Sequence, residues 1–594
     1  MCGLCAEINL AQEPVDGARI NLMLDAMRRR GPDARGSFVD GNIGLGHVRL
    51  SILDLDPRSD QPMRDEVGRV IVFNGEIYNH AELKRDLDGR HRFRTTSDTE
   101  VVLAAYAAWG VDCFRRFNGD WAMAILDPTQ DRLVLSRDRF GIKPLFMARS
   151  GGRIRIASTV GAILASGHSA RLPEDSVTRM LRRGKPDPGA GSWLEGVDAV
   201  EPGTCLVLDR SGLASQHRYW GEDDVFGAEI PDRYEEAVEA FGGLLADSVR
   251  LRLAADVPVG VCLSGGLDSS LIVGLGARVA GQGPIRTYSG IATGHPSDES
   301  AYARAVVEDA GTIPEFIELD LDGFIRSFPD VVIAQESVLG SADTVARWLV
   351  LERASRDVTV LLDGQGGDEL LAGYPRMHRR LEDERLRDRF LARAAPKSPQ
   401  SDIEPLKELA GDLRADRAGR AHTRPNPERS LDPVTLQQYE SLHGAGLRSL
   451  LHTEDRLTMG FSMEGRVPFL DHRLVSMCFS APLSFRIQNQ DKRMARDFAR
   501  RHHVVPRAIH ERLDKRGFDS PFAELLRSDA GVTWLKGMFE GLTRSGGGLD
   551  GLVDQQVVGM IVEGHARGPV DESRRLVRLI SLGILLDRWQ ASVG

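Results

Sequence analysis

The chain has 594 residues, of which 42% are hydrophobic and 27% charged, a composition typical of a soluble globular protein with two to four domains. Its net charge of −10 argues against a general electrostatic affinity for nucleic acid. Six cysteines in so long a chain are too few for a secreted disulfide framework. We find neither a signal-peptide pattern nor an apolar run long enough to span a bilayer. We therefore expect a cytoplasmic protein that binds neither nucleic acid nor membrane.

Residues 2–215 contain short strand-like stretches separated by turns, among them "GNIGLGHVRLSIL", "RVIVFNGEIYN" and "WAMAILD". A helix is expected in "SDTEVVLAAYAAWG", with Ser97 or Asp98 as its N-cap and Gly110 at its end. Many strands with few helices predict a β-rich α+β domain.

From residue 235 the pattern changes to apolar strand-like runs that alternate with helical segments. "VPVGVCL" and "DVTVLLDG" have the length of buried strands, and each is followed by a glycine-rich turn and a helix. This alternation predicts an α/β, doubly wound parallel sheet. Residues 216–234 are acidic and turn-rich, as expected of a linker. Residues 378–430 form a charged insertion punctuated by prolines, and the chain ends in a helical region.

The stretch "VGVCLSGGLDSS" has the features of a phosphate-binding turn. A buried strand ends at Leu263, Gly265 and Gly266 permit a tight turn, and a helix is expected to begin near Ser269. The backbone N–H groups of such a turn suit a phosphate anion. Asp268 would repel a bare phosphate, so we predict that it binds Mg²⁺. An ordinary glycine-rich turn is the alternative, but the strand before it and the D-S-S after it make that alternative weak.

This S-G-G-x-D-S pattern resembles the PP-loop of ATP pyrophosphatases, which adenylate a substrate and release pyrophosphate. A second acidic cluster, "LLDGQGGDELLAGY", follows another predicted strand, and Asp368 or Glu369 could supply a second Mg²⁺ ligand. The carboxyl ends of parallel strands converge where such sheets bind nucleotides. We therefore expect both clusters to face one site that binds ATP and Mg²⁺.

Over nearly its whole length the chain resembles the asparagine synthetases, which join an N-terminal-nucleophile glutaminase to a PP-loop domain. The resemblance implies stacked antiparallel sheets with flanking helices in residues 2–215 and a synthetase domain in residues 235–594. It also allows a homodimer. The matching stretches, in order, include "MCG", "RRRGPDARG", "HVRLSILDL", "FNGEIYNH", "TTSDTEVVL", "FNGDWAMAILD", "LSRDRFGIKPLF", "SGGLDSS", "GQGGDELLAGY", "EDRLTMGFSMEGRVPFLDHRLV" and "DKRGFDSPF".

The first residues carry the glutaminase nucleophile that the resemblance implies. Once Met1 is removed, the Cys2 thiol can attack the glutamine amide while its own α-amine takes the proton. The pKa of an α-amine, about 7.7–8.0, suits a general base. Cys5, which completes a C-x-x-C spacing, is expected to be a small core residue because no second pair or redox context accompanies it.

The resemblance also assigns residues that bind glutamine. The Asn74 side chain and the Gly75 N–H match the family's oxyanion hole. Arg49 matches the cation for the substrate carboxylate, Asp98 the anion for its ammonium, and Glu76 lies in the same binding segment. Considered singly, Arg49 could be a surface ion-pair residue and Asp98 a helix cap.

In the second half the resemblance implies acyl-adenylate formation followed by attack of ammonia that travels through the protein interior. Lys515 matches a lysine that stabilises charge on the phosphates, and Lys492 is a second candidate; either could instead be a solvated surface lysine. The expected ATP contacts are Leu263, Ser264, Gly265, Gly266, Asp268, Ser269, Gly290, Asp363, Gly364 and Lys492.

Three departures from the family pattern concern the acceptor. Gln365 replaces a glutamate that is linked to intermediate formation, and glutamine cannot accept a proton from ammonia at neutral pH. Either another group does so, Asp363 being one candidate, or the acceptor differs. Gln335-Glu336-Ser337 stands where D-E-P is frequent, and Thr159 where S-E ends a strand. Aspartate is the default acceptor, and another carboxylic acid competes with it.

Other functions are weighed against this prediction. A ring-closing synthetase would be expected to lose the glutaminase nucleophile, whereas Cys2 and its partner residues are present. A non-catalytic binding protein would have no need of the complete PP-loop. A glutaminase joined to a phosphoribosyltransferase would require an acidic diphosphate-ribose motif, which we do not find.

Overall fold

The computed structural model describes residues 2–184, 192–279, 283–375, 377, 426, 429, 431–488, 490–513 and 520–593. Most of the predicted charged insertion at 378–430 lies outside these ranges, and so does Lys515. Every other residue singled out above as a site residue is described.

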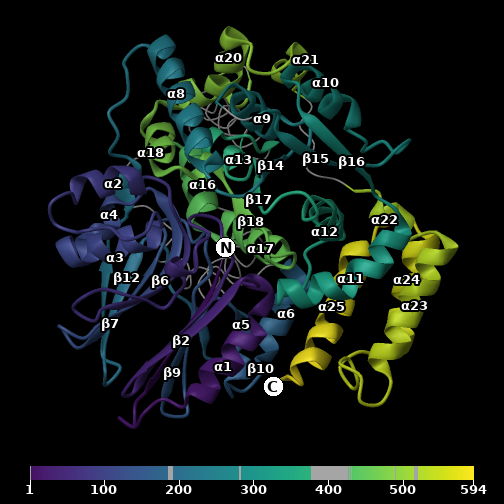
Figure 1. Cartoon of the computed structure of the whole chain (residues 1–594). Helices are drawn as coiled ribbons and strands as arrows, with labels where there is room; N and C mark the ends of the chain where they lie inside the picture. Colours follow the sequence, from purple (N-terminus) through teal and green to yellow (C-terminus); the bar gives the residue numbers. More distant parts are fainter. Residues whose placement is uncertain are drawn as a thin grey trace, which may run out of the picture.

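The first half of the chain is built on two six-stranded antiparallel sheets, as predicted (Figure 1). The first sheet has the order β11 (Val197–Ala199), β8 (Phe146–Ser150), β9 (Arg153–Ala157), β1 (Gly3–Asn9), β3 (Ile43–Arg49), β2 (Ala34–Asp40). The second has the order β13 (Ala214–Arg218), β12 (Thr204–Asp209), β7 (Arg132–Arg137), β6 (Gly119–Asp127), β5 (Val70–Ile77), β4 (Met63–Arg64).

Alternating side chains explain why the two sheets stack. Leu4, Ala6 and Ile8 of β1 share one buried core with residues of β5 and β6 in the other sheet. Cys5 points to the opposite face and packs under α1 with Ile20, which confirms it as a core residue. The helices of this half are α1 (Gly17–Ala26), α2 (His80–Asp86), α3 (Asp98–Trp109), α4 (Cys113–Arg116), α5 (Val160–Ala165) and α6 (Glu174–Arg183).

The second half contains the predicted parallel sheet. Its five strands run in the order β16 (Ile313–Glu318), β15 (Arg286–Ile291), β14 (Val259–Cys262), β17 (Val360–Leu362), β18 (Glu464–Arg466), and each neighbouring pair is parallel. Val261 packs on one face of the sheet with residues of α8 and α9, whereas Cys262 packs on the other with residues of α12. Helices therefore cover both faces, as expected of a doubly wound fold.

The helices around this sheet occupy the upper and right-hand parts of Figure 1. They are α7 (Glu222–Val225), α8 (Tyr234–Leu253), α9 (Leu267–Val279), α10 (Ser300–Ala310), α11 (Leu321–Gln335), α12 (Asp343–Ala354), α13 (Gly367–Leu371), α16 (Pro433–His443), α17 (Ala445–Met459), α18 (His472–Ser480), α19 (Leu483–Arg486), α20 (Arg493–His502) and α21 (Arg507–His510).

The C-terminal region is helical and returns to the first half. It comprises α22 (Phe522–Leu525), α23 (Asp529–Thr543), α24 (Gln555–Arg567) and α25 (Ser573–Trp589), the last packing on α11. Beyond α25, β19 (Ser592–Val593) pairs with β10 (Arg171–Leu172) of the first half. Within the described ranges we find no helix long and apolar enough to cross a membrane.

Candidate functional site

The predicted nucleophile lies immediately before the first strand. Cys2 is 8% exposed, and its backbone nitrogen donates to Asn74 Oδ1 at 2.9 Å. Burial raises the pKa of the Cys2 thiol, so the thiol keeps its proton at neutral pH and needs a base. The nitrogen bound by Asn74 becomes the α-amine when Met1 is removed. Gly3, the first residue of β1, has little room for a side chain, because a Cβ there would lie 2.9 Å from Val48 Cγ2.

Asn74 and Gly75, the predicted oxyanion donors, lie on β5 opposite β6. The Asn74 side chain is fully buried; its oxygen is used by Cys2, whereas its Nδ2 has no hydrogen-bond partner among the described residues. A buried amide donor without a partner is costly unless a ligand satisfies it. Gly75 has no room for a side chain, because a Cβ would lie 2.1 Å from the Asp120 carbonyl oxygen.

The structure brings the predicted glutamine-binding residues into one small cavity of about 30 Å³. The walls come from Cys2, from the end of β3 and the segment after it, from β5, and from the start of α3. The predicted residues that line it are Cys2, Arg49, Gly75, Glu76 and Asp98, with Asn74 hydrogen-bonded to Cys2.

Arg49 and Asp98 are oriented by neighbouring protein groups. Arg49 donates to Asp60 Oδ1 at 2.7 Å, and the Asp60 side chain is 40% exposed. Asp98 is the first residue of α3 and accepts from the Ile77 N–H at 2.8 Å, whereas Ser97 is the helix N-cap. Burial raises the pKa of Asp98. Arg49 thus forms an ion pair, as in the alternative given from the sequence, and it also lines the pocket.

Two residues of the second half complete this pocket. Glu464, on β18 of the parallel sheet, lines the cavity. Arg466, on the same strand and fully buried, lies 2.6 Å from Glu464 Oε1 and 3.4 Å from Glu76 Oε2. Burial and the charge of Asp98 raise the pKa of Glu76 well above its ordinary value, and Arg466 offsets part of that effect. The glutamine pocket therefore depends on a strand almost 400 residues downstream.

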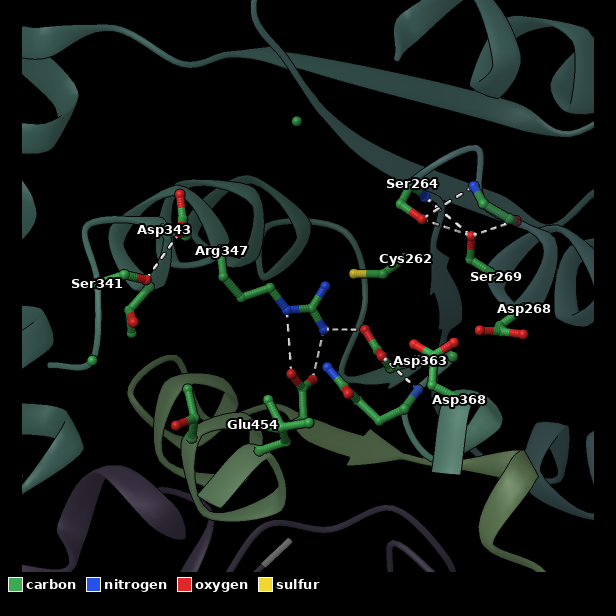
Figure 2. Close-up of a pocket in the computed structure, with 18 of the residues that line it drawn as sticks. Cys262, Ser264, Asp268, Ser269, Ser341, Asp343, Arg347, Asp363, Asp368 and Glu454 are labelled. Carbon is green, nitrogen blue, oxygen red and sulfur yellow. Dashed lines mark hydrogen bonds and ion pairs between the residues drawn. The ribbon is translucent and has the colours of Figure 1, made fainter. Parts of the chain in front are cut away.

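The PP-loop joins β14 to α9 and faces a much larger cavity of about 900 Å³ (Figure 2). The turn is closed by the hydroxyl of Ser269, which accepts from the Ser264 N–H at 3.2 Å. Gly265 has φ +77°, and a Cβ there would lie 2.9 Å from the Ala303 nitrogen, so the position requires glycine. The helix begins at Leu267, two residues before the predicted start.

Most residues predicted to contact ATP line this cavity. Figure 2 shows the side chains of the PP-loop on one side of it and those of α12 and α17 on the other. The predicted residues in its wall are Leu263, Ser264, Gly266, Asp268, Ser269, Gly290, Asp363, Gly364, Gln365, Asp368 and Lys492. Gly265 lies in the same loop without lining it.

The two predicted metal ligands face each other across a lysine. Lys492 Nζ lies 2.5 Å from Asp268 Oδ2 and 2.7 Å from Asp368 Oδ1, and the side chain is buried. Burial lowers the pKa of Lys492, but the two carboxylates more than offset this and raise it above its ordinary value. Among the described residues no three potential ligands form a metal cluster. The pair of carboxylates nevertheless fits a cation, because they already bind one.

A second ion-pair group lies beyond the PP-loop (Figure 2). Arg347 of α12 lies 2.6 Å from Asp363 Oδ2 and 2.7 Å from Glu454 Oε1 of α17. Asp363 also accepts from the Gln365 N–H at 3.0 Å, which fixes the turn after β17. Burial raises the pKa of Glu454. Two carboxyl groups thus lie close to the glutamine that replaces the family glutamate.

The other two departures meet at the junction between the halves. Glu336 accepts from the first two backbone N–H groups of α5 at 3.0 and 2.8 Å, and Thr159 is the N-cap of that helix. Glu336 therefore contacts the first half, whereas its neighbours Gln335 and Ser337 line the large cavity. The Q-E-S segment serves both the junction and the cavity wall.

Several charged residues at these sites were not predicted from the sequence. All except Arg347 lie inside a stretch that matches the family pattern, and that match was the available signal. They are Arg30 in "RRRGPDARG", Arg347 in "ARWLV", and Glu454, Asp455, Glu464 and Arg466 in or beside "EDRLTMGFSMEGRVPFLDH".

Comparisons with known proteins agree with this arrangement. Residues 240–591 match the asparagine synthase family, and residues 1–220 match the glutamine amidotransferase domain. Asparagine synthetase (glutamine-hydrolyzing) 3 of Bacillus subtilis is 28% identical over 528 residues, 84% of each chain. Putative asparagine synthetase (glutamine-hydrolyzing) 2 of Methanocaldococcus jannaschii is 34% identical over 400 residues, 63% of this chain and 76% of that protein. Amidase chry2 of Gibberella zeae is 32% identical over 375 residues, 59% of this chain and 54% of that protein.

These matches, together with a glutaminase-type domain and an ATP-site domain in one chain, define a glutamine-dependent carbon–nitrogen ligase. The synthase match spans more than half of the chain. The protein belongs to the asparagine synthase family and carries a glutamine amidotransferase domain at its N-terminal end.

Proposed function

We propose that this enzyme transfers glutamine-derived ammonia to a carboxylic acid that it first adenylates with ATP, with aspartate as the acceptor and asparagine as the product. One observation carries the proposal. A Cys2 nitrogen bound by Asn74 in a small pocket and a PP-loop facing a cavity of about 900 Å³ occur in a single chain. Residues 2–215 would hydrolyse glutamine, 216–234 link the domains, and 235–594 make the amide.

In the first site, the Cys2 thiol would attack the amide carbon of glutamine and pass its proton to the Cys2 α-amine. The α-amine would return that proton to the amide nitrogen as the C–N bond breaks and ammonia leaves, and water would then hydrolyse the thioester to release glutamate. The oxyanion would receive hydrogen bonds from the unpartnered Asn74 Nδ2 and from Gly75 N–H. Arg49 would bind the substrate carboxylate, and Asp98 with Glu76 its ammonium. Since the pocket holds only about 30 Å³, the Arg49–Asp60 pair must open when glutamine enters.

In the second site, a carboxylate oxygen would attack the α-phosphorus of ATP and release pyrophosphate. Ammonia would then attack the acyl carbon, lose a proton and expel AMP. The PP-loop N–H groups and Lys492 and Lys515 would bind the phosphates. Mg²⁺ held by Asp268 and Asp368 would offset phosphate charge. Ammonia would pass between the sites inside the protein, since water would protonate it.

The proton on ammonia needs an acceptor other than Gln365. Asp363 and Glu454 are the nearby carboxyl groups, joined through Arg347 at 2.6 and 2.7 Å. Burial raises the pKa of Glu454 above its ordinary value, which favours this carboxylate as a base. We propose that one of these groups does what a glutamate does elsewhere in the family.

A second acceptor class deserves the same test. Gln365 and the Gln335-Glu336-Ser337 segment both depart from the family pattern in or beside the cavity. A relative at 32% identity is named an amidase rather than an asparagine synthetase. These observations keep a carboxylic acid other than aspartate, used by the same mechanism, as the second candidate. In either case we propose small-molecule substrates, a cytoplasmic location and a homodimer, with no nucleic-acid or membrane partner.

The test is a pyrophosphate-release assay on the purified full chain with ATP, Mg²⁺ and glutamine. Aspartate and a panel of other carboxylic acids are supplied one at a time, and the amide product is identified by mass spectrometry. Aspartate-dependent pyrophosphate with asparagine as product supports the first acceptor. Release with a different acid alone replaces it, and release with none contradicts the synthetase function.

A further inference from the structure

A buried ion pair joins the two halves of the chain beside the nucleophile. Arg30 Nη1 donates to Asp455 Oδ2 at 2.8 Å and Nη2 donates to Oδ1 at 3.0 Å, and each side chain is 4% exposed. Arg30 ends the short turn after α1, whereas Asp455 lies on α17 of the second half. Two parallel hydrogen bonds to one carboxylate fix the plane of a guanidinium group.

The remaining donor of Arg30 binds the main chain of Cys2. Arg30 Nε donates to the Cys2 carbonyl oxygen at 3.0 Å. The ladder of β1 begins at Gly3, so Cys2 lies outside it. Its backbone is instead held at the nitrogen by Asn74 and at the carbonyl by Arg30. The orientation of Arg30 therefore bears on the position of the thiol.

Asp455 is itself fixed by its two neighbours on α17. Glu454 lies 2.7 Å from Arg347 in the wall of the ATP cavity. Arg456 lies 3.0 Å from Glu336, which caps α5 of the first half. Three consecutive buried charged residues of α17 thus form ion pairs with three different segments of the chain. Burial alone would raise the pKa of Asp455, but Arg30 holds it below its ordinary value, so this carboxylate stays charged.

We propose that Asp455 is a positioning residue for glutamine hydrolysis, acting by orienting Arg30 against the carbonyl of Cys2. The proposal rests on the role of Cys2 as the nucleophile. It means that the synthetase half supplies part of the glutaminase site, so that the first domain alone would hold its nucleophile loosely.

The experiment measures glutamine hydrolysis by the full chain, which requires no knowledge of the acceptor. Asp455→Asn keeps the shape and removes the charge, and we expect kcat to fall about 30-fold with the KM for glutamine changed less than about two-fold. The pair acts on the nucleophile and not on the substrate, and small misplacements of a reacting group are costly. Arg30→Lys retains a cation facing Asp455 but loses the Nε donor, and it should lower kcat similarly.

The double variant Arg30→Lys/Asp455→Asn should lose little beyond either single change, because both act through one contact. Ser462→Ala is the matched control. Ser462 Oγ donates to the Arg29 carbonyl at 2.6 Å and so crosses the same junction one residue away, without reaching Cys2. This variant should retain kcat within about two-fold.

The outcomes separate this inference from the proposed function. A wild-type chain that hydrolyses no glutamine would contradict the glutaminase function itself. A wild-type chain that is active, with Asp455→Asn equally active, would overturn the inference, as would additive losses in the double variant. Thermal unfolding is measured for each variant, and if Asp455→Asn fails to fold, Arg30→Lys decides alone: an unchanged kcat there overturns the inference.

Discussion

The two sites of this enzyme are built in opposite ways. The predicted glutamine pocket is a small cavity of about 30 Å³, formed where antiparallel strands end, and its polar groups are held largely by backbone atoms. The ATP cavity holds about 900 Å³ at the carboxyl edge of a parallel sheet, and its charged groups are paired with one another.

The difference indicates which contacts each site must exchange when its substrate binds. The proposed nucleophile Cys2 is already held by the proposed oxyanion donor Asn74, whose Nδ2 has no hydrogen-bond partner among the described residues. In the ATP cavity Lys492 occupies the carboxylates that we assign to Mg²⁺, so nucleotide binding must exchange ion pairs. The first site is preorganised, whereas in the second the ion pairs between protein groups must be exchanged for contacts with the ligand.

The largest expected effect separates the two sites completely. Cys2→Ala should lower glutamine hydrolysis at least about 10,000-fold, because no other group can form the thioester. Amide synthesis from free ammonia, measured with the acceptor found in the carboxylate panel, should persist. Cys5→Ala, at a buried thiol on the opposite face of β1, is the matched control and should hydrolyse glutamine normally. Loss of both activities in Cys2→Ala would mean that the sites are not separate.

A substitution in the ATP cavity should have the opposite effect and impair pyrophosphate release alone. Asp268→Asn should lower pyrophosphate release about 1,000-fold, since it removes a charge that pairs with Lys492 and that we assign to Mg²⁺. Glutamine hydrolysis should be unchanged. Asp309→Asn, an exposed acid at the end of α10, is the control. If Asp268→Asn released pyrophosphate normally, the role of the carboxylate pair would be wrong.

The preorganisation of the glutamine pocket can be tested at its unsatisfied donor. Asn74→Ala should lower kcat for glutamine hydrolysis about 100-fold, because Nδ2 would donate only to the developing oxyanion. Steady-state kinetics should show a smaller change in KM. A change in KM without a change in kcat would place Asn74 in ground-state binding instead.

The smallest expected effect is on the pH dependence of stability and involves a buried histidine of the first half. His47 is fully buried on β3 beside Phe73, and burial lowers its pKa to about 3. The unfolded chain binds a proton near pH 6.5 and the folded one does not. Because the unfolded chain binds this extra proton, the free energy of unfolding is unaffected above about pH 6.5 and decreases as the pH falls toward 3. Between pH 7 and 5 the loss is about 2 kcal/mol.

Urea unfolding of wild type and His47→Gln checks this expectation. Gln retains a donor for the Phe73 carbonyl and does not titrate, so the variant should lose about 2 kcal/mol less stability than wild type between pH 7 and 5. Equal losses in the two proteins would show that His47 is not responsible.

Much of the fold and site could be predicted because the decisive patterns are local. "SGGLDSS" fixes a strand, a turn and a helix within a few residues, and Gly265 is required there by its positive φ. The prediction for Lys492 was less complete, since its two partners lie in the first turns of separate helices, α9 and α13, which only the parallel sheet brings together.

The sequence by itself determined where the nucleophile and the PP-loop are, because covalent order and backbone geometry act over short distances. The tertiary structure alone decided which residues complete them. Arg466 reaches Glu76 across 390 residues, and Asp455 reaches Arg30 across 425. Such pairs depend on how α17 and β18 pack against the first half, and packing over that separation leaves no periodic trace in a single sequence.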